Sequence, residues 1–112
     1  MLTRISSALA LCAVLTAIAP AASAQNIVGH AAAGKAKANM CVGCHAVPGY
    51  RTAYPKVYHV PKIGGQQQAY IIAALKEYRA GERWHPSMRA IAGSLTDQDI
   101  ADLAAYFGGH KQ

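Results

Sequence analysis

The pentapeptide Cys41-Val42-Gly43-Cys44-His45 constrains the fold of this chain more than any other feature. On a helical turn, residues at i, i+3 and i+4 share one face, so both thiols and the imidazole point the same way. The C-x-x-C-H spacing is typical of covalent c-type haem attachment. The sequence therefore predicts one covalently bound haem c, held by Cys41 and Cys44, with His45 as an axial ligand of its iron.

Three other interpretations of Cys41, Cys44 and His45 account for the sequence less well. A thioredoxin-like redox pair belongs to an alternating strand and helix pattern, and no segment here alternates as a strand does. A structural zinc ion needs a fourth ligand, and His59 and His85 have no recognisable spacing for that role. A disulfide between cysteines three residues apart closes a very small loop, contributes little stability and leaves His45 without a role.

The first 24 residues have the pattern of a secretory signal peptide. A basic start is followed by an apolar run at residues 9–19 and by a small-residue cleavage site at residues 22–24. The apolar run is too short to cross a bilayer as a helix, which argues against a membrane anchor. We expect cleavage and export to the periplasm, leaving residues 25–112 as a single domain.

Charge and composition limit the classes of partner and the size of the core. The chain has 11 basic and five acidic residues, and its formal net charge is +6 at pH 7. Because there is no basic run, nucleic acid is not an expected partner, whereas acidic protein surfaces are. Large aliphatic side chains are few and alanine is common. A domain this small therefore needs further apolar area to bury, which a haem would supply.

Three segments have the composition or the period of helices, so we predict an all-α fold. Residues 28–42 contain strong helix formers and no proline. Residues 67–80 carry an apolar stripe at helical spacing, and Gly81 is placed to end that helix. A third helix is expected to begin after the N-cap residue Thr96 and to end at the glycines 108–109. The intervening residues 46–66 and 82–94 lack an apolar period, so both segments are predicted to be loops.

The sixth coordination position of the iron decides the function, because an open position allows ligand binding and a filled one favours electron transfer. Met88 is the preferred ligand, since it lies in the second predicted loop and is free to approach the far face of the ring. Met40 precedes Cys41 on the attachment helix and cannot easily reach that face. His85 is the main competitor of Met88. The remaining candidates are His30, His59 and His110.

The order and spacing of these features resemble the class I c-type cytochromes, specifically the small single-haem periplasmic proteins of bacteria. The resemblance covers residues 28–109. It rests on Gly34, CVGCH at 41–45, PKIGGQ at 61–66, Met88 and LTDQDIADLAAYF at 95–107. It implies the small class I cytochrome c fold, in which the N- and C-terminal helices cross and long loops wrap one haem.

The resemblance also assigns roles to individual residues. It implies that Gly34 lets the N-terminal helix cross the C-terminal helix near Tyr106, and that the carbonyl of Pro61 accepts a hydrogen bond from His45. The haem pocket is then expected to be lined by Pro61, Ile63, Tyr70, Ile71 and Leu75. Residues 46–60 depart from the common pattern because they are rich in aromatic and basic residues. The tyrosines in this segment either pack as in an ordinary loop, shield a haem edge or form a docking surface.

These expectations predict a periplasmic one-electron carrier that is not an enzyme. Its partners would be a redox protein donor and acceptor, from membrane respiratory complexes or a periplasmic dehydrogenase, met in transient complexes by a monomer without a small-molecule substrate. Basic residues around the haem edge could steer acidic partners; the candidates are Arg51, Lys56, Lys62, Arg83 and Arg89. Two alternatives stay open, a haem subunit of a periplasmic dehydrogenase and a haem enzyme or ligand sensor with an open sixth position.

Overall fold

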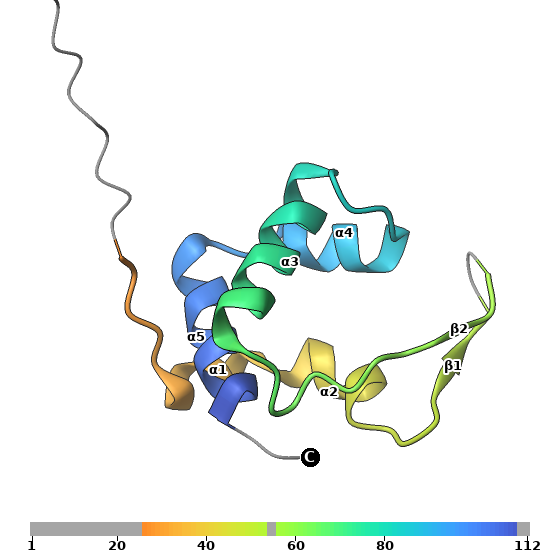
Figure 1. Ribbon diagram of the computed structural model, residues 1–112, viewed down its shortest axis with the longest axis horizontal. Coiled ribbons are helices and arrows are strands. Elements are labelled where there is room, and N and C mark those ends of the chain that lie inside the picture. The colour runs from red at the N-terminus through yellow and green to blue at the C-terminus, as the bar shows by residue number, and fades with distance from the viewer. Residues whose placement is uncertain (1–25, 54–55, 110–112) are drawn as a thin grey trace, which may run out of the picture.

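The computed structural model describes residues 26–53 and 56–109, so the predicted signal peptide lies outside the described residues. Five helices and one two-stranded antiparallel sheet follow one another along this part of the chain (Figure 1). They are α1 (Ala31–Lys37), α2 (Asn39–His45), β1 (Arg51–Thr52), β2 (Tyr58–His59), α3 (Gln68–Ala80), α4 (Pro86–Gly93) and α5 (Asp97–Gly109). No helix in the described ranges is both long and apolar enough to cross a bilayer.

The first and last helices, α1 and α5, cross in close contact, as predicted. Gly34 is buried at the crossing. A Cβ atom at this position would overlap the carbonyl oxygen of Asp102 and lie 2.8 Å from the Cβ of Tyr106. The prediction that Gly34 permits the crossing near Tyr106 is therefore confirmed, and the reason is the space available rather than the backbone conformation.

A buried carboxylate joins the two ends of the chain at this crossing. Asp102, which is only 2% exposed, accepts hydrogen bonds from the backbone N–H of His30 (2.9 Å), from Nζ of Lys37 (2.8 Å) and from Nε2 of Gln98 (2.8 Å). The hydrogen bond from Lys37, aided by that from His30, lowers the pKa of Asp102 from 3.8 to about 2. The amide of Gln98 also donates to the carbonyl oxygen of Val28 (2.9 Å), so the segment that precedes α1 is fixed to α5.

Capping residues end α3 and begin α5 where the sequence predicts. Gly81 adopts a left-handed conformation (φ 82°), and its N–H donates to the carbonyl oxygen of Tyr78 (3.2 Å). Thr96 precedes α5, and its Oγ1 accepts a hydrogen bond from the N–H of Asp99 (3.1 Å) while the Asp99 carboxylate accepts one from the N–H of Thr96 (2.9 Å). This reciprocal pair is a capping box with aspartate in place of glutamate.

The predicted helix over residues 28–42 is wrong in its bounds. The structure begins α1 at Ala31, ends it at Lys37 and continues with α2 to His45 after a break at Ala38. The N–H of Ala38 donates to the carbonyl oxygen of Lys35 (3.3 Å), three residues earlier, so the chain tightens there for one turn. No proline or glycine marks this break in the sequence.

A short β-hairpin occupies part of the predicted loop over residues 46–66, which corrects that prediction. Strands β1 and β2 pair antiparallel, with Arg51 opposite His59 and Thr52 opposite Tyr58. In addition, the N–H of Val60 donates to the carbonyl oxygen of Tyr50 (2.9 Å). Two-residue strands are too short to produce a detectable alternation in the sequence.

Helix α4 lies where the sequence predicted the loop 82–94, so that prediction is also wrong. Pro86 is the first residue of α4, a position where its missing N–H costs nothing and its fixed φ favours the helix. It therefore begins the helix rather than breaking it. Met88, Ile91 and Leu95 follow at spacings of three and four residues, which is the helical period.

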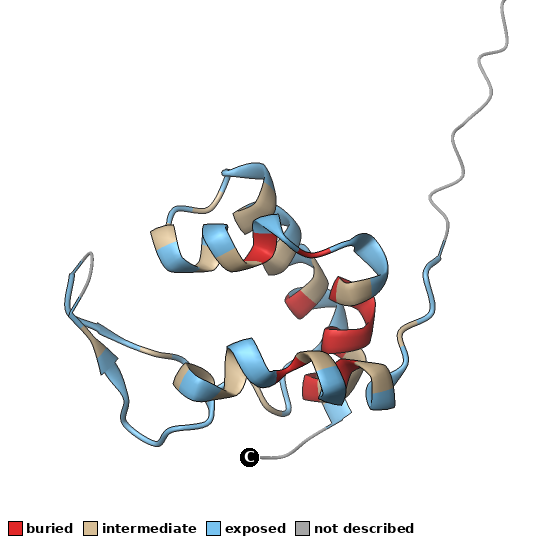
Figure 2. Cartoon of the chain, turned by 180° about the vertical axis from the view of Figure 1, so that it is seen from behind, coloured by how far each residue is buried: buried red, intermediate tan, exposed pale blue. Residues whose placement is uncertain are grey.

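Burial is uneven over the molecule. Buried residues gather where α1, α3 and α5 meet, whereas the hairpin and its flanks are exposed (Figure 2). The central cluster consists of Ala38, Ile71, Leu95, Ile100, Leu103, Ala104 and Phe107. The few large side chains in this cluster agree with the expectation of a core too small to account for the whole domain.

Candidate functional site

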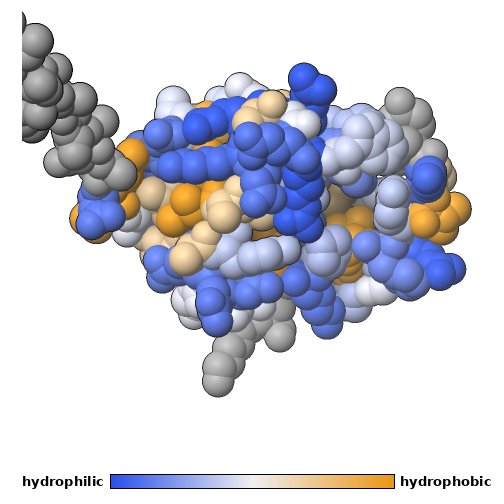
Figure 3. Space-filling model, turned by 45° about the horizontal axis from the view of Figure 1, so that its top comes forward, coloured by the Kyte–Doolittle hydropathy of each residue, from blue (hydrophilic) through white to orange (hydrophobic). Residues whose placement is uncertain are grey.

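A single cavity of about 540 Å³ brings together all the residues that the sequence predicted for the site. Those residues are Cys41, Cys44, His45, Pro61, Ile63, Tyr70, Ile71, Leu75 and Met88. Figure 3 shows apolar side chains lying between hydrophilic ones on one face of the molecule. The volume falls within the range of about 300–1,000 Å³ typical of small-molecule and cofactor sites.

Helix α2 forms the first wall of the cavity. It contributes Cys41 and Cys44, both free thiols, and His45. Burial, with a smaller effect from Cys44, raises the pKa of the Cys41 thiol. Nδ1 of His45 lies 2.6 Å from the carbonyl oxygen of Pro61. A carbonyl oxygen can only accept, so Nδ1 carries the proton and donates it, and the lone pair of Nε2 is free for a metal ion.

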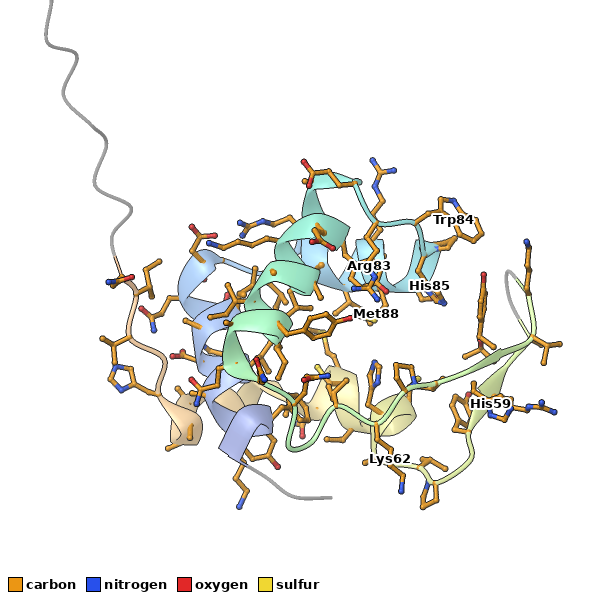
Figure 4. The ribbon with its side chains drawn as sticks, in the orientation of Figure 1. His59, Lys62, Arg83, Trp84, His85 and Met88 are labelled. Atoms are coloured by element: carbon orange, nitrogen blue, oxygen red, sulfur yellow. The ribbon has the colours of Figure 1, made fainter. Side chains whose placement is uncertain are left out.

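Helix α4 and the residues after it form the opposite wall. Met88, Ile91 and Leu95 line the cavity from this side. Met88 and His85 point from the start of α4 toward the space between α4, α2 and the hairpin (Figure 4). Trp84 also lines the cavity, but its side chain is largely exposed. Sequence reasoning missed the roles of Ile91 and Leu95, although their spacing from Met88 was a usable signal once Pro86 is taken as a helix start.

Helix α3 and Arg83, which lies two residues after the C-cap Gly81, form the third wall of the cavity. Tyr70, Leu75 and Tyr78 line the cavity together with Arg83. The Arg83 guanidinium lies over the ring of Tyr78, 5.0 Å from its centroid, and Nη1 donates a hydrogen bond to the hydroxyl of Tyr70 (3.3 Å). The hydrogen bond to Tyr70 is the main cause of a raised pKa at Arg83. Arg83 therefore belongs to the cavity wall as well as to the surface.

The hairpin and the chain after it close the cavity partly on its remaining side, through Thr52, Tyr58, His59 and Lys62. The hydroxyl of Thr52 is buried and has no hydrogen-bond partner within the described part of the chain. An occupant with polar groups at its edge and a flat apolar body would satisfy this hydroxyl and cover the apolar walls. A haem, with carboxylates at one edge of its macrocycle, fits both requirements.

The structure narrows the candidates for the sixth ligand. Met40, Met88, His59 and His85 line the cavity. His30 instead precedes α1, with its N–H bound to Asp102, and His110 lies outside the described residues. Nε2 of His59 is paired with Nε of Arg51 at 3.0 Å.

The basic residues predicted to steer acidic partners lie in different parts of the structure. Lys62 and Arg83 line the cavity. Arg89 is exposed on α4, and its guanidinium approaches Gly81. Lys56 is exposed near the hairpin end, and Arg51 is on β1.

Comparison with known proteins settles the family. The family model described as cytochrome c matches residues 31–110, which include the C-x-x-C-H motif and every residue of the cavity walls. The chain belongs to the cytochrome c family. Its cofactor is accordingly a covalently bound haem c with its iron, and the prediction of a class I c-type cytochrome is confirmed.

Individual relatives agree with this assignment. This cytochrome is 39% identical over 83 residues to cytochrome c4 of Pseudomonas aeruginosa, a match that covers 74% of this chain and 39% of that protein. It is 38% identical over 86 residues to cytochrome c-554(548) of Halomonas halodenitrificans, covering 74% of this chain and 99% of that protein. The chain thus spans well under half the length of the cytochrome c4 relative but nearly all of the shorter one.

A solved structure confirms the class I cytochrome c fold. The cytochrome c4 structure of Acidithiobacillus ferrooxidans, described as supporting a complex-induced tuning of electron transfer, superposes with a TM-score of 0.59 at 29% sequence identity. The match covers 73% of this chain and 51% of that one.

Proposed function

We propose that this cytochrome is a periplasmic one-electron carrier whose haem is bound through Cys41 and Cys44, with His45 and Met88 as axial ligands of the iron. The observation that carries this proposal is that α2 and α4 bring these four residues to opposite walls of one cavity. When bound, the haem supplies the one-electron chemistry of its iron. The chain has to hold the ring, fix the ligands and limit the access of water.

Each part of the cavity has a defined role in this proposal. The two thiols anchor the macrocycle, and the hydrogen bond to Pro61 fixes the orientation and donor strength of His45. The thioether of Met88 would hold the iron from the wall opposite His45, and two fixed ligands would keep rearrangement small when the haem gains or loses an electron. Methionine ligation and an apolar wall that contains Ile71 and Leu75 both favour a high reduction potential.

The proposed location and partners rest on the signal-peptide pattern of residues 1–24 and on the distribution of charge. The first acidic residue in the whole sequence is Glu77, so the hairpin side of the cavity, which contains Arg51, Lys56 and Lys62, carries basic charge alone. Farther along the chain, Asp99 and Asp102 are both paired with Lys37. The uncompensated positive charge beside the cavity favours a redox protein with an acidic surface as partner.

A redox titration with visible spectroscopy on the exported holoprotein tests the electron-carrier proposal. We expect a single one-electron transition, a spectrum with the thioether–iron absorption band in the oxidised state, and no rapid binding of carbon monoxide by the reduced protein at neutral pH. Rapid, stoichiometric binding of carbon monoxide would show an open sixth position and contradict the proposal.

The partner proposal has its own test, which uses Lys62→Glu and the matched control Lys35→Glu. Lys62 lines the cavity, whereas Lys35 is exposed on α1. Electron transfer to an acidic redox protein should slow in the Lys62 variant and lose much of its dependence on ionic strength, while the control stays close to the unsubstituted protein. Equal effects of the two variants would indicate that only net charge matters.

A further inference from the structure

We infer that His85 is a positioning residue for Met88, acting through its ring nitrogen as the N-cap of α4, and is not a rival ligand of the iron. The inference rests on the proposed function, because it assumes that Met88 binds the iron. It assigns a role to His85, the main competitor of Met88 for the sixth position.

The first argument is the hydrogen bond that His85 makes. His85 has extended backbone angles (φ −167°, ψ 114°), and its side chain accepts a hydrogen bond from the backbone N–H of Met88, with 3.4 Å between Met88 N and Nδ1. This is the N-cap arrangement, in which a side chain satisfies an N–H group of the first helical turn. Met88 is the third residue of α4, so the cap acts directly on its backbone.

The second argument concerns the proton on the imidazole ring. A backbone N–H can only donate, so Nδ1 of His85 presents its lone pair to Met88. A neutral imidazole has one protonated nitrogen and one with a free lone pair, which places the proton of His85 on Nε2. In this arrangement neither nitrogen of His85 has a lone pair left for a metal ion.

His45 has the opposite arrangement. Its Nδ1 faces the carbonyl oxygen of Pro61 at 2.6 Å, so Nδ1 is protonated and Nε2 keeps its lone pair. Histidines that bind metals donate their other ring N–H to an acceptor of this kind. His45 and His85 therefore hold different tautomers, one suited to binding iron and the other to capping a helix.

Two features limit the conformations of His85. Pro86 follows as the first residue of α4 and restricts the backbone of His85 to the extended region in which an N-cap residue lies. From the hairpin, the ring of Tyr58 lies 5.7 Å from the ring of His85, at an interplanar angle of 53°. The hairpin thus packs against the residue that fixes the start of α4, and through it affects the position of the Met88 sulfur.

Two substitutions separate capping from ligation. Asparagine is a favoured N-cap residue, so His85→Asn keeps an acceptor for the N–H of Met88 but removes the imidazole. His85→Ala removes both. The measurement is the thioether–iron absorption band of the oxidised holoprotein as a function of temperature, together with the reduction potential of each variant.

We expect His85→Asn to keep the band, its thermal midpoint and the potential of the unsubstituted protein. His85→Ala should lose the band at lower temperature, because the equilibrium for detachment of Met88 increases roughly fivefold when a cap is lost. Loss of the band in both variants would mean that the imidazole itself is required, and identical behaviour of both variants and the unsubstituted protein would mean that His85 positions nothing. Either result overturns the inference while leaving a His45-ligated electron carrier possible.

Nitrogen-15 NMR of the reduced holoprotein gives a direct readout that does not depend on how the variants fold. The inference requires the proton of His85 on Nε2, and a proton on Nδ1 of His85 contradicts it. If the unsubstituted protein has no thioether–iron band at all, Met88 is not the ligand, and both the proposed ligation and this inference fail.

Discussion

The crossing of α1 with α5 and the wall formed by α2, the hairpin and α4 are built on different principles. At the crossing, Gly34 lets backbone meet backbone and Asp102 has all its contacts within the chain. Around the cavity, apolar and polar groups are left facing a space of about 540 Å³. Thr52 even lacks a hydrogen-bond partner within the described residues.

This difference means that the chain alone stabilises the crossing, whereas the cofactor helps to stabilise the cavity wall. Close packing by the chain's own atoms stabilises the crossing, so its stability should depend mainly on sequence changes there. The cavity wall is complete only when the haem is in place, and its order should depend on the haem. Substitutions at the α1–α5 crossing and substitutions at the cavity wall should therefore change different measured properties of the protein.

The largest effect should come from Cys41→Ser combined with Cys44→Ser. Without the thiols the haem loses its covalent bonds, so none should stay with the polypeptide after denaturation in acidified organic solvent. Hydrogen exchange measured on the non-denatured protein should accelerate in α2 and the hairpin and remain slow in α5, because the contacts of α5 with α1 do not use the haem. Equal acceleration throughout α5 would show that the two regions fold as one unit.

The next effect in size concerns the crossing itself. Gly34→Val would force side-chain carbons into the backbone of α5, and we expect a loss of about 3 kcal/mol or more in the free energy of unfolding. Urea unfolding of the holoprotein measures it. Gly93→Ala is the matched control, because a Cβ at Gly93 meets nothing within 4 Å, and it should change the free energy by well under 1 kcal/mol.

Met88→Ala should affect the cavity side alone. The thioether–iron band should disappear, and the reduction potential should fall by on the order of 0.1–0.2 V, part of the roughly 0.8 V range that axial ligands set in haem proteins. Leu95→Ala is a useful comparison, since it truncates a buried cavity residue that has no donor atom. It should lower stability but keep the band, and an unchanged spectrum in Met88→Ala would transfer the ligand role to another residue.

Acid should weaken the crossing through Asp102. Its pKa is lowered from 3.8 to about 2 in the folded protein, so the folded state binds a proton less readily than the unfolded state. The stabilisation is complete above about pH 4 and is lost as the pH falls toward 2. Asp102→Asn should cost about 1–3 kcal/mol at neutral pH and flatten the stability profile in this acidic range.

The control for Asp102 is Asp97→Asn. Asp97 is an exposed carboxylate paired with Arg79, and its loss should destabilise the protein much less than the loss of Asp102, because exposed ion pairs contribute little. Unfolding curves recorded between pH 2 and pH 7 compare the two variants. A pH profile for Asp102→Asn that matches the unsubstituted protein would mean that another group causes the acid sensitivity.

The smallest effect should come from the cap of α5. Thr96→Ala removes the hydroxyl that accepts from the N–H of Asp99 and should cost about 1 kcal/mol. Thr96→Ser keeps the hydroxyl and should restore most of that loss. Thermal unfolding measures both variants, and the thioether–iron band at room temperature should be the same in each, because the cap lies on the crossing side.

Much of the fold and the site could be predicted because the relevant signals are local. The capping residues Gly81 and Thr96 act within one helical turn, and the C-x-x-C-H motif places its three functional groups on one face. The hydrogen bond between His45 and Pro61 was expected from resemblance, and its geometry is present. The assignment of individual haem and iron ligands remains a prediction.

The errors have physical causes that the local sequence does not reveal. Residues 82–94 lack a clear apolar period and are therefore predicted to be a loop, although Pro86 at the first position of α4 favours a helix. The hairpin depends on pairing between Thr52 and Tyr58, residues that are separated in sequence and have no strand-like neighbours. The capping role of His85 required the three-dimensional position of the Met88 N–H, which no pattern of residue types specifies.

The hydrogen bond from Gln98 to the carbonyl oxygen of Val28 has a practical consequence for attaching this protein to surfaces. It fixes the segment before α1 on the side of the molecule away from the hairpin (Figure 1). A linker joined just ahead of this segment would therefore leave the protein on the side away from the hairpin. If the cytochrome were immobilised on an electrode through such a linker, its cavity would face the solution, where a soluble partner could reach it. The cavity would then lie far from the electrode surface.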